Sequence, residues 1–379
     1  MKLCKKICLF LASLMLLGSF AACGGSSAGT GNSDNNGGGA GGNTNVGDNG
    51  NGDVGGEDEE EELISVLTDK KYKRGFTVRG LGLPIYPEHA EEETVEGAHL
   101  YDPGYLFQYG KTDLDAPVWQ LCQWATRYGF HDESVTTFSD LGNGKYSYTN
   151  PSKTFKVDTQ TGEIYLGLDA SECYVYGDRT AGQEWPHLLL SRDIKRNANS
   201  KVSDKSSINV SLDIALDKFE DKMTSPVNTG LHSAMCLFYV FVSNWDEASN
   251  NFSDMLWLGM GLFDNRYEYS PEMGMADEGS KDSATGKYIY NIAGDQYLSN
   301  GNNFYEDGEI KVDSEKYVSI DFDILPFIQI ALSRAQQNGM MKSSKFENLY
   351  ISGMYIGFEL PGTYDIAMHF KNMDITVKY

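Results

Sequence analysis

Two acidic residues, Asp264 and Glu359, are the candidates for acid–base chemistry in this sequence. Each stands at the end of an apolar run that has the texture of a strand. A pair of carboxylates, one protonated and one ionised, is a common arrangement for general acid–base catalysis. Sequence alone cannot pair residues from different strands, so each residue keeps an alternative. Asp264 could form a salt bridge with Arg266, and Glu359 could be a solvated hairpin residue before Pro361-Gly362.

The five tryptophans are the second group of interest, because flat rings at polar strand ends stack on the apolar faces of sugars. Trp185 and Trp245 stand among polar neighbours, so we expect both rings to be exposed. Trp257 lies inside an apolar run and is expected in the core. Trp119 and Trp124 are five residues apart, so on one strand they face opposite sides, with at least one in the core.

Composition and charge exclude several kinds of partner and cofactor. The 379 residues carry 31 Lys and Arg against 54 Asp and Glu, a net charge of −23. Nucleic acids and anionic lipid surfaces require a basic footprint, so neither is expected as an electrostatic partner. The six His are scattered without paired ligand spacing, so we predict no metal site and no cofactor. A structural calcium bound by scattered Asp stays an open alternative.

The first 22 residues read as an export signal. Lys2, Lys5 and Lys6 precede an apolar run, Ile7 to Phe20, that is too short to span a bilayer as a mature helix. The segment Phe20-Ala21-Ala22-Cys23 resembles the lipobox of a bacterial lipoprotein, although Phe20 departs from the usual aliphatic residue. The resemblance implies that Cys23 becomes the mature N-terminus and carries diacylglycerol, which anchors the protein to the bacterial membrane outside the cytoplasm. An ordinary secretory peptide is the alternative.

Residues 23–62 have the composition of a flexible tether. They contain 14 Gly, seven Asn and no Lys or Arg, and they end in the acidic run Glu57 to Glu62. Such a segment cannot bury apolar surface, so we predict that it stays unfolded.

Residues 63–379 are predicted to form the folded domain, with 28 basic and 45 acidic groups, a net charge of −17. Aromatic and β-branched runs bounded by turn residues indicate strands, and Ile208 to Leu216 alternates apolar and polar residues. These runs are Met235–Val242, Met255–Phe263, Tyr350–Leu360 and Tyr364–Phe370. One helix is expected between a capping Asp323 and Gly339. The pattern predicts an all-β fold, a two-sheet antiparallel sandwich of the jelly-roll type with one short inserted helix.

Two further features of the folded region are less specific. The polar stretch Lys195 to Ser207 is the best candidate for a domain break, which would give two tandem sandwiches, and a long loop explains it equally well. Beyond the signal segment and Cys23, three cysteines remain: Cys122, Cys173 and Cys236. At most one disulfide can form among them, and Cys122 and Cys236 are expected as buried free thiols because their surroundings are apolar.

Four stretches in chain order carry a resemblance to a known superfamily. They are the loop and strand start Glu184-Trp185-Pro186-His187, the Gly-containing strand from Trp257 to Arg266, Asp321 to Phe327 with the expected helix after it, and the final hairpin Tyr355 to Asp365. This order resembles the concanavalin A-like jelly rolls of exported bacterial glycan-active proteins. The resemblance implies a sheet that holds an extracellular glycan, with binding contributed by Trp185, His187, Trp245, Asp264, Arg266, Tyr355 and Glu359.

The resemblance does not extend to a specific enzyme family. Retaining glucanases on this fold carry a Glu-x-Asp-x-x-Glu strand, and no Glu-x-Asp occurs in this chain. Three hypotheses therefore remain. The favoured one is a lipid-anchored surface protein that binds carbohydrate. The others are a glycoside hydrolase or polysaccharide lyase, with Asp264 and Glu359 as weak catalytic candidates, and a structural or adhesive envelope protein.

Overall fold

The computed structural model describes residues 63–81, 85–86, 105–277, 287–299 and 301–379. The signal segment, Cys23 and the tether lie outside these residues. None of the helices in the described parts of the chain is long and apolar enough to cross a membrane.

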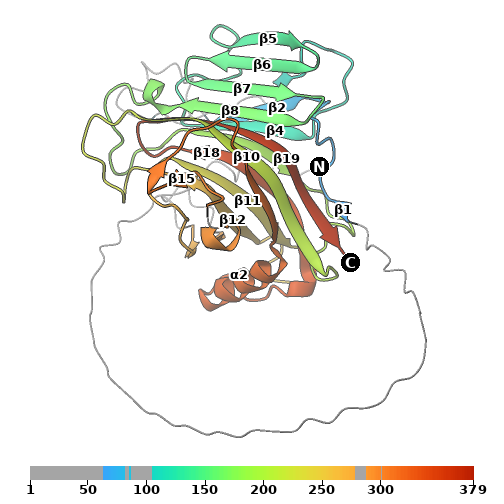
Figure 1. Ribbon diagram of the computed structural model, residues 1–379. Helices are drawn as coiled ribbons and strands as arrows, with labels where there is room; N and C mark the ends of the chain where they lie inside the picture. The colour runs from blue at the N-terminus through green and yellow to red at the C-terminus, as the bar shows by residue number, and fades with distance from the viewer. Residues whose placement is uncertain (1–62, 82–84, 87–104, 278–286, 300) are drawn as a thin grey trace, which may run out of the picture.

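Two large sheets face each other and form a sandwich (Figure 1). In spatial order, sheet A contains β17 (Val318–Asp323), β10 (Ser207–Asp221), β19 (Tyr364–Lys378), β8 (Glu163–Asp169), β7 (Lys153–Asp158), β6 (Lys145–Asn150) and β5 (Thr137–Gly142), with β1 (Ile64–Ser65) paired to β19. Sheet B contains β13 (Met273–Ala276), β14 (Tyr288–Ile292), β12 (Met255–Asp264), β11 (Met235–Asn244), β18 (Leu349–Glu359), β9 (His187–Asp193), β4 (Trp119–Trp124), β2 (Phe76–Leu81) and β3 (Leu106–Phe107). The predicted all-β sandwich is confirmed.

The strand pairing is antiparallel in both large sheets with two exceptions. In sheet B, β12 pairs with β14 and β2 pairs with β4 in parallel. A small separate hairpin joins β15 (Tyr305–Glu306) to β16 (Glu309–Ile310). The parallel pairs lie towards the two edges of sheet B, so the centre of that sheet is an antiparallel array of β12, β11, β18, β9 and β4, with one register shift between β11 and each of its neighbours.

The central strands of sheet B are buried on both faces. All ten residues of β11 are buried, and nearly all of β12 and β18. Ring contacts show which face meets sheet A, since Phe358 of β18 lies 6.3 Å from Phe370 of β19, and Phe263 of β12 lies 5.4 Å from Phe219 of β10. Successive residues of a strand point to opposite faces, so Glu359 points away from sheet A. We call this the distal face of sheet B.

The predicted helix is present as α2 (Leu325–Gln337), and it packs beside β12, β14 and β13. Asp323 contributes to its start, because its carboxylate accepts the backbone N–H of Leu325 at 3.0 Å. In Figure 1 this helix lies below the sheets. Gln336 of α2 donates to the carbonyl of Ser344, and the Ser344 hydroxyl accepts from Asn244, which pairs with Leu349 at the opposite end of β18 from Glu359. The helix therefore covers one end of the sandwich and leaves the other end to loops.

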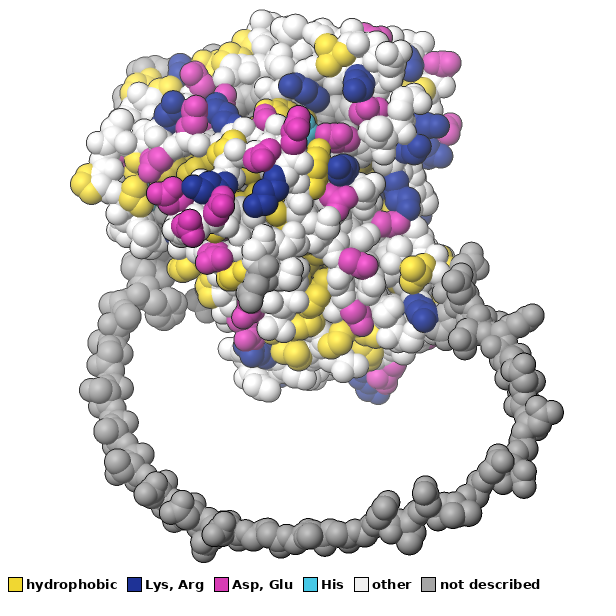
Figure 2. Space-filling model, in the orientation of Figure 1, with side chains coloured by type: hydrophobic (Ala, Val, Ile, Leu, Met, Phe, Trp, Pro, Cys, Tyr) yellow, Lys and Arg dark blue, Asp and Glu magenta, His cyan; other side chains and the backbone are white. Residues whose placement is uncertain are grey.

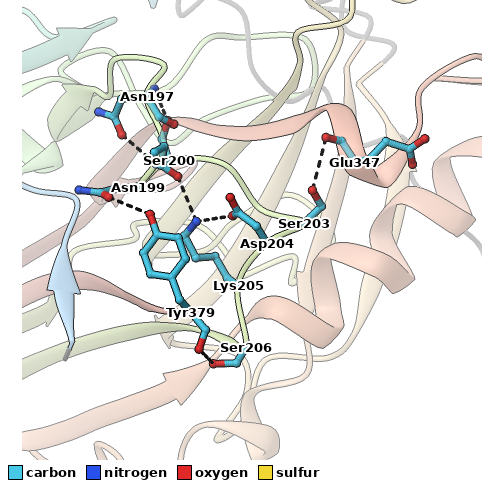
Figure 3. Close-up of polar contacts among 10 residues, drawn as sticks. Asn197, Asn199, Ser200, Ser203, Asp204, Lys205, Ser206, Glu347 and Tyr379 are labelled. Carbon is cyan, nitrogen blue, oxygen red and sulfur yellow. Dashed lines mark hydrogen bonds and ion pairs between the residues drawn. The ribbon is translucent and has the colours of Figure 1, made fainter. Parts of the chain in front are cut away.

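The polar stretch after β9 is a packed loop that leads from sheet B to β10 of sheet A. Figure 3 shows its interactions with Tyr379. The fully buried ammonium of Lys205 forms an ion pair with Asp204 and donates to the carbonyl of Ala198 at 3.0 Å. It also lies 3.9 Å from the centroid of the Tyr379 ring. Ser206 donates to the Tyr379 carbonyl at 3.0 Å, so the loop is fixed to the end of β19.

The surface in Figure 2 shows basic and acidic side chains intermixed, without a region of one sign. Lys218 of β10 is typical, because its ammonium lies 2.9 Å from Asp169, 3.7 Å from Glu220 and 3.7 Å from Asp365. Exposed pairs of this kind add little stability. They do reduce the field that the net negative charge would otherwise produce on this face.

One glycine holds the site strand against its neighbour. Gly357 of β18 has φ +149°, and a Cβ built on it would lie 2.2 Å from the carbonyl oxygen of Leu188 in β9. Both the backbone conformation and the contact with β9 therefore require glycine. Gly167 of β8 is different, because a Cβ there would meet its nearest atoms at 3.5 Å, an ordinary contact distance.

We expect Gly357→Ala to lower the free energy of unfolding by about 2 kcal/mol or more, through backbone strain and displacement of β9. Gly167→Ala is the matched control and should change it far less. Chemical denaturation of both variants checks this. Equal stability of the two variants would contradict the assignment of Gly357 as a constrained position.

Candidate functional site

A row of side chains crosses five neighbouring strands at one end of the distal face. The pairing register aligns Trp124 with His187, His187 with Glu359, Glu359 with Met235, and Met235 with Asp264. We call these five residues the distal row. The row brings together His187, Glu359 and Asp264, three of the residues predicted from the sequence, on β9, β18 and β12.

Glu359 is the most enclosed member of the distal row. Its side chain has no exposed surface, so its alternative as a solvated hairpin residue is wrong. Tyr355 donates its hydroxyl to Glu359 Oε1 at 3.2 Å. The two residues share one face of β18 four positions apart, and the missing side chain of Gly357 between them leaves room for the tyrosine ring to lie along the strand.

His187 faces the second oxygen of Glu359. Its Nδ1 lies 2.7 Å from the carbonyl oxygen of Trp185, and because a carbonyl can only accept, Nδ1 carries a hydrogen. Its Nε2 lies 3.6 Å from Glu359 Oε2. Trp185 is stacked against one side of the imidazole with ring centroids 5.7 Å apart, and Trp124 meets it edge-on at 5.8 Å. The ring is therefore held with Nε2 directed at the carboxyl, at a distance longer than a hydrogen bond.

Asp264 forms the salt bridge considered for it from the sequence. Arg266 donates Nε to Asp264 Oδ1 at 2.9 Å and Nη2 to Oδ2 at 2.6 Å, a bidentate pair. The side chain of Asp264 is 7% exposed and that of Arg266 is 15% exposed. Asp264 and Glu359 are separated by one strand, so their Cα atoms are roughly 10 Å apart.

Two tyrosines of the distal face have pKa values that are raised by burial and by the same nearby carboxylates. Burial, and then the charge of Glu359, raise the pKa of Tyr355 well above its ordinary value. Burial, followed by the charge of Glu359, also raises the pKa of Tyr239. Asp277 contributes in the same direction to both. Both phenols therefore stay protonated, and Tyr355 acts as a hydrogen-bond donor to Glu359.

Several polar atoms on the distal face have no hydrogen-bond partner among the described residues, although they are buried. They include Glu359 Oε2, Trp257 Nε1 and Gln120 Oε1, on β18, β12 and β4. Unpartnered buried polar atoms cost stability and require an explanation. This set mixes donors and acceptors, as the hydroxyl groups of a sugar do.

The glycines of β12 let other groups come close to this strand, as their positions in the sequence indicated. The groups that do so are side chains of the protein itself. A Cβ on Gly259 would lie 2.1 Å from Asn291 Oδ1 and 2.6 Å from Tyr239 Cε1. A Cβ on Gly261 would lie 2.3 Å from Ser270 Oγ. These glycines let aromatic and amide groups pack on the distal face.

A small hollow, open to solvent and with a cavity volume of about 20 Å³, adjoins the distal row at Met235. Its lining is formed by Arg179, Trp185, Gly230, Leu231, Ser233, Met235, Arg266 and Pro361. Through Met235 and Arg266 the hollow is in direct contact with the row that holds Glu359 and Asp264. We call it the arginine hollow.

The expected exposure of two tryptophans needs correction. Trp185 is buried, 3% exposed, because the guanidinium of Arg179 covers its ring at 4.6 Å. Trp245 is half-buried against Phe252, and it follows the opposite end of β11 from Met235. The structure therefore does not bring Trp245 to the distal row. Its polar sequence neighbours misled the prediction, because tertiary contacts cover the ring.

The other tryptophans and the cysteines behave as expected. Trp257 is buried in the distal face, and Trp119 and Trp124 are buried on opposite faces of β4. Cys122, Cys173 and Cys236 are all buried and free. Within the described residues no group of three or more His, Cys, Asp or Glu is arranged to hold a metal ion.

The sequence reasoning missed two polar residues of the distal face, Asp277 and Asn291. Asp277 is buried just after β13, and its charge reaches Tyr239 and Tyr355. Asn291 lies on β14 beside Gly259. No motif or spacing marks either residue, since both depend on the parallel pairing of β14 with β12.

No model of a known protein family matches the sequence, and no curated protein sequence is significantly similar to it. Solved structures give distant likenesses. An endoglucanase from Rhodothermus marinus matches with 13% identity and a TM-score of 0.30, over 64% of this chain and 96% of that chain. A family 12 xyloglucanase from Bacillus licheniformis matches with 10% identity and a TM-score of 0.35, over 64% and 100%. A family 11 xylanase from Neocallimastix patriciarum matches with 8% identity and a TM-score of 0.32, over 65% and 97%.

Because Trp185 supports both His187 and Arg179, we expect Trp185→Ala to lower the free energy of unfolding by about 3–5 kcal/mol, the cost of emptying a core position. Trp245→Ala removes the same side chain from a half-buried position and should cost clearly less. Denaturant titration followed by far-UV circular dichroism distinguishes the two. A Trp185→Ala variant as stable as the parent would show that the ring is not part of the core.

Proposed function

We propose that the protein acts on an extracellular carbohydrate, and that the distal row is the acid–base site of a glycoside hydrolase. One observation carries the proposal: the row places a buried glutamate that faces His187 two strands from an ion-paired aspartate. Inverting glycosidases hold their two carboxyl groups about 6.5–9.5 Å apart, which is close to the strand spacing between Glu359 and Asp264.

In this proposal Glu359 is the general acid. Its carboxyl donates a proton to the glycosidic oxygen as the bond from that oxygen to the anomeric carbon breaks. Tyr355 orients Oε1 from one side, and His187 Nε2 faces Oε2 from the other at 3.6 Å.

Asp264 is the general base in the same scheme. Its carboxylate accepts a proton from the water that attacks the anomeric carbon, so that a C–O bond to water replaces the bond to the leaving sugar. Arg266 holds the carboxylate in position through two hydrogen bonds. Substrate would have to displace Met235, which lies between the two acidic residues in the register.

Binding without hydrolysis is the second candidate, and one observation favours it. Both oxygens of Asp264 are occupied by Arg266, and Glu359 has no exposed surface. In that case the arginine hollow and the distal row would recognise a glycan without cleaving it. This was the favoured hypothesis from the sequence, and product release separates it from hydrolysis.

Glu359→Gln in the full-length protein, purified in detergent, should lower the rate of product release from its polysaccharide by about a hundredfold or more, because the amide cannot donate the proton. Glu163→Gln is the matched control. Glu163 Oε1 also pairs with a histidine, His369, at 2.6 Å, but on sheet A. A polysaccharide panel assayed for reducing ends gives the measurement. Retention of the glycan without product release by the parent protein would favour binding, and full activity of Glu359→Gln would refute the assignment.

We further propose that the protein is anchored outside the cytoplasm by lipid on Cys23. The support is the apolar run that ends in Ala21-Ala22-Cys23, followed by a Gly-rich segment that cannot fold.

Cys23→Ala should abolish incorporation of a labelled fatty acid during growth, because the thiol that carries the lipid is absent. The label should remain in a Cys173→Ala variant, which removes a buried thiol of the folded domain. Labelling of the Cys23→Ala protein at the parent level would contradict lipid attachment at this residue.

A further inference from the structure

The arginine hollow has an unusual charge for so acidic a protein. Two of its lining side chains are guanidinium groups, Arg179 and Arg266, and none of its lining residues is acidic. The charge of Arg266 is neutralised by its ion pair with Asp264. Arg179 is the informative residue, because its charge has no such partner.

Arg179 is 6% exposed and is fixed by three contacts. It donates Nε to the carbonyl of Gln183 at 3.0 Å and Nη1 to the carbonyl of Leu231 at 3.0 Å. Its guanidinium also lies 4.6 Å from the centroid of the Trp185 ring. All three contacts hold the group in place without neutralising it, and Nη2 has no acceptor among the described residues.

The acidic groups near Arg179 do not pair with it. Asp178 is occupied by the hydroxyl of Thr363 at 2.6 Å and by Thr224 at 2.9 Å. Glu184 acts on Arg179 as a charge without a hydrogen bond between them. Burying a guanidinium without a counter-ion is costly, so a group of this kind points to an anionic ligand.

We propose that the arginine hollow binds the carboxylate of a uronic acid residue, which makes the substrate class of the site an acidic polysaccharide. This inference rests on the proposed action on carbohydrate. With Nε and Nη1 already donating to backbone carbonyls, Nη2 of Arg179 is the group that can donate to a carboxylate oxygen. Arg266 and Ser233 line the same hollow.

The position of the hollow fits the distal row. Met235 and Arg266 belong both to the lining and to the immediate surroundings of Asp264. A sugar held by its carboxylate in the hollow would therefore place the next sugar of the chain over Met235, between Glu359 and Asp264. The net negative charge of the folded region repels polyanions at long range. The two arginines of the hollow counteract this repulsion locally.

Gly230 offers a test that leaves both arginines intact. It is an exposed lining residue, its φ is outside the left-handed region, and a Cβ built on it meets only Asn228 Oδ1, at 3.4 Å. Gly230→Asp places a negative charge at the rim of the hollow, and Gly230→Asn is the neutral variant of the same shape. Any difference in binding between the two variants is therefore an effect of the added charge.

The full-length Glu359→Gln protein in detergent is titrated calorimetrically with uronate oligosaccharides and with the same oligosaccharides after reduction of their carboxyl groups. We expect the uronate forms to bind at least tenfold more tightly, Gly230→Asp to remove that preference, and Gly230→Asn to keep it. Arg179→Gln should also remove it, with Arg196→Gln as control, since Arg196 likewise stacks on a ring, that of Tyr350, at the far end of β18.

Equal affinity for the charged and reduced oligosaccharides, or an unchanged preference in Gly230→Asp, overturns the uronate site and leaves the hydrolase proposal intact. Tighter binding of sulfated oligosaccharides than of uronates also overturns it, because it assigns the hollow to a sulfate ester. Parent-level hydrolysis by Glu359→Gln refutes the role of Glu359, while a preference for uronates that Gly230→Asp removes still supports the site.

Discussion

Burial of the central strands of sheet B on both faces is the constraint on which the other features depend. One face of β11, β12 and β18 packs against sheet A, as Phe358 and Phe263 do against Phe370 and Phe219. The other face is packed with its own rings, with Tyr239 5.0 Å from Tyr355 and Phe241 5.0 Å from Trp257. A carboxyl on that second face is therefore removed from water, and Glu359 acquires its partners inside the protein.

The same constraint explains why small residues recur on the distal face. Rings that lie flat on a sheet need space beside them, and glycines provide it at Gly259, Gly353 and Gly357. The glycines also let strands or side chains come closer than a Cβ would allow. The geometry of Tyr355, His187 and Glu359 thus depends on residues that have no polar groups to contribute.

Much of the fold could be predicted from the sequence because its signals are local. The apolar run Met235–Val242 is the core of β11, Ile208–Leu216 lies within β10, and the helix expected before Gly339 is α2. The turn residues Pro361-Gly362 also lie where a hairpin joins β18 to β19. The alternation of apolar and polar residues, the length of a strand and the type of a turn each depend on a few consecutive residues.

The site could be predicted only in part, because it depends on register. Asp264 and Glu359 were identified as ends of apolar strands, but their shared row comes from the pairing of both with Met235. The polar neighbours of Trp185 suggested exposure, whereas Arg179 covers the ring. Asp277 reaches the distal face through β13 and β14, at a distance along the chain that no local pattern records.

The pairing of β1 with β19 determines at which end of the sandwich the described chain begins. Ile64 pairs with Val377, close to the C-terminal end of β19. The 15 residues of that strand span roughly 45–50 Å, and the hairpin at its other end joins it to β18 beside Glu359. The described chain therefore begins at one pole of the sandwich, and the distal row lies at the other. Whatever is joined to the domain ahead of Leu63 therefore attaches at the pole opposite the arginine hollow, so that the point of attachment does not obstruct a polymer approaching the hollow.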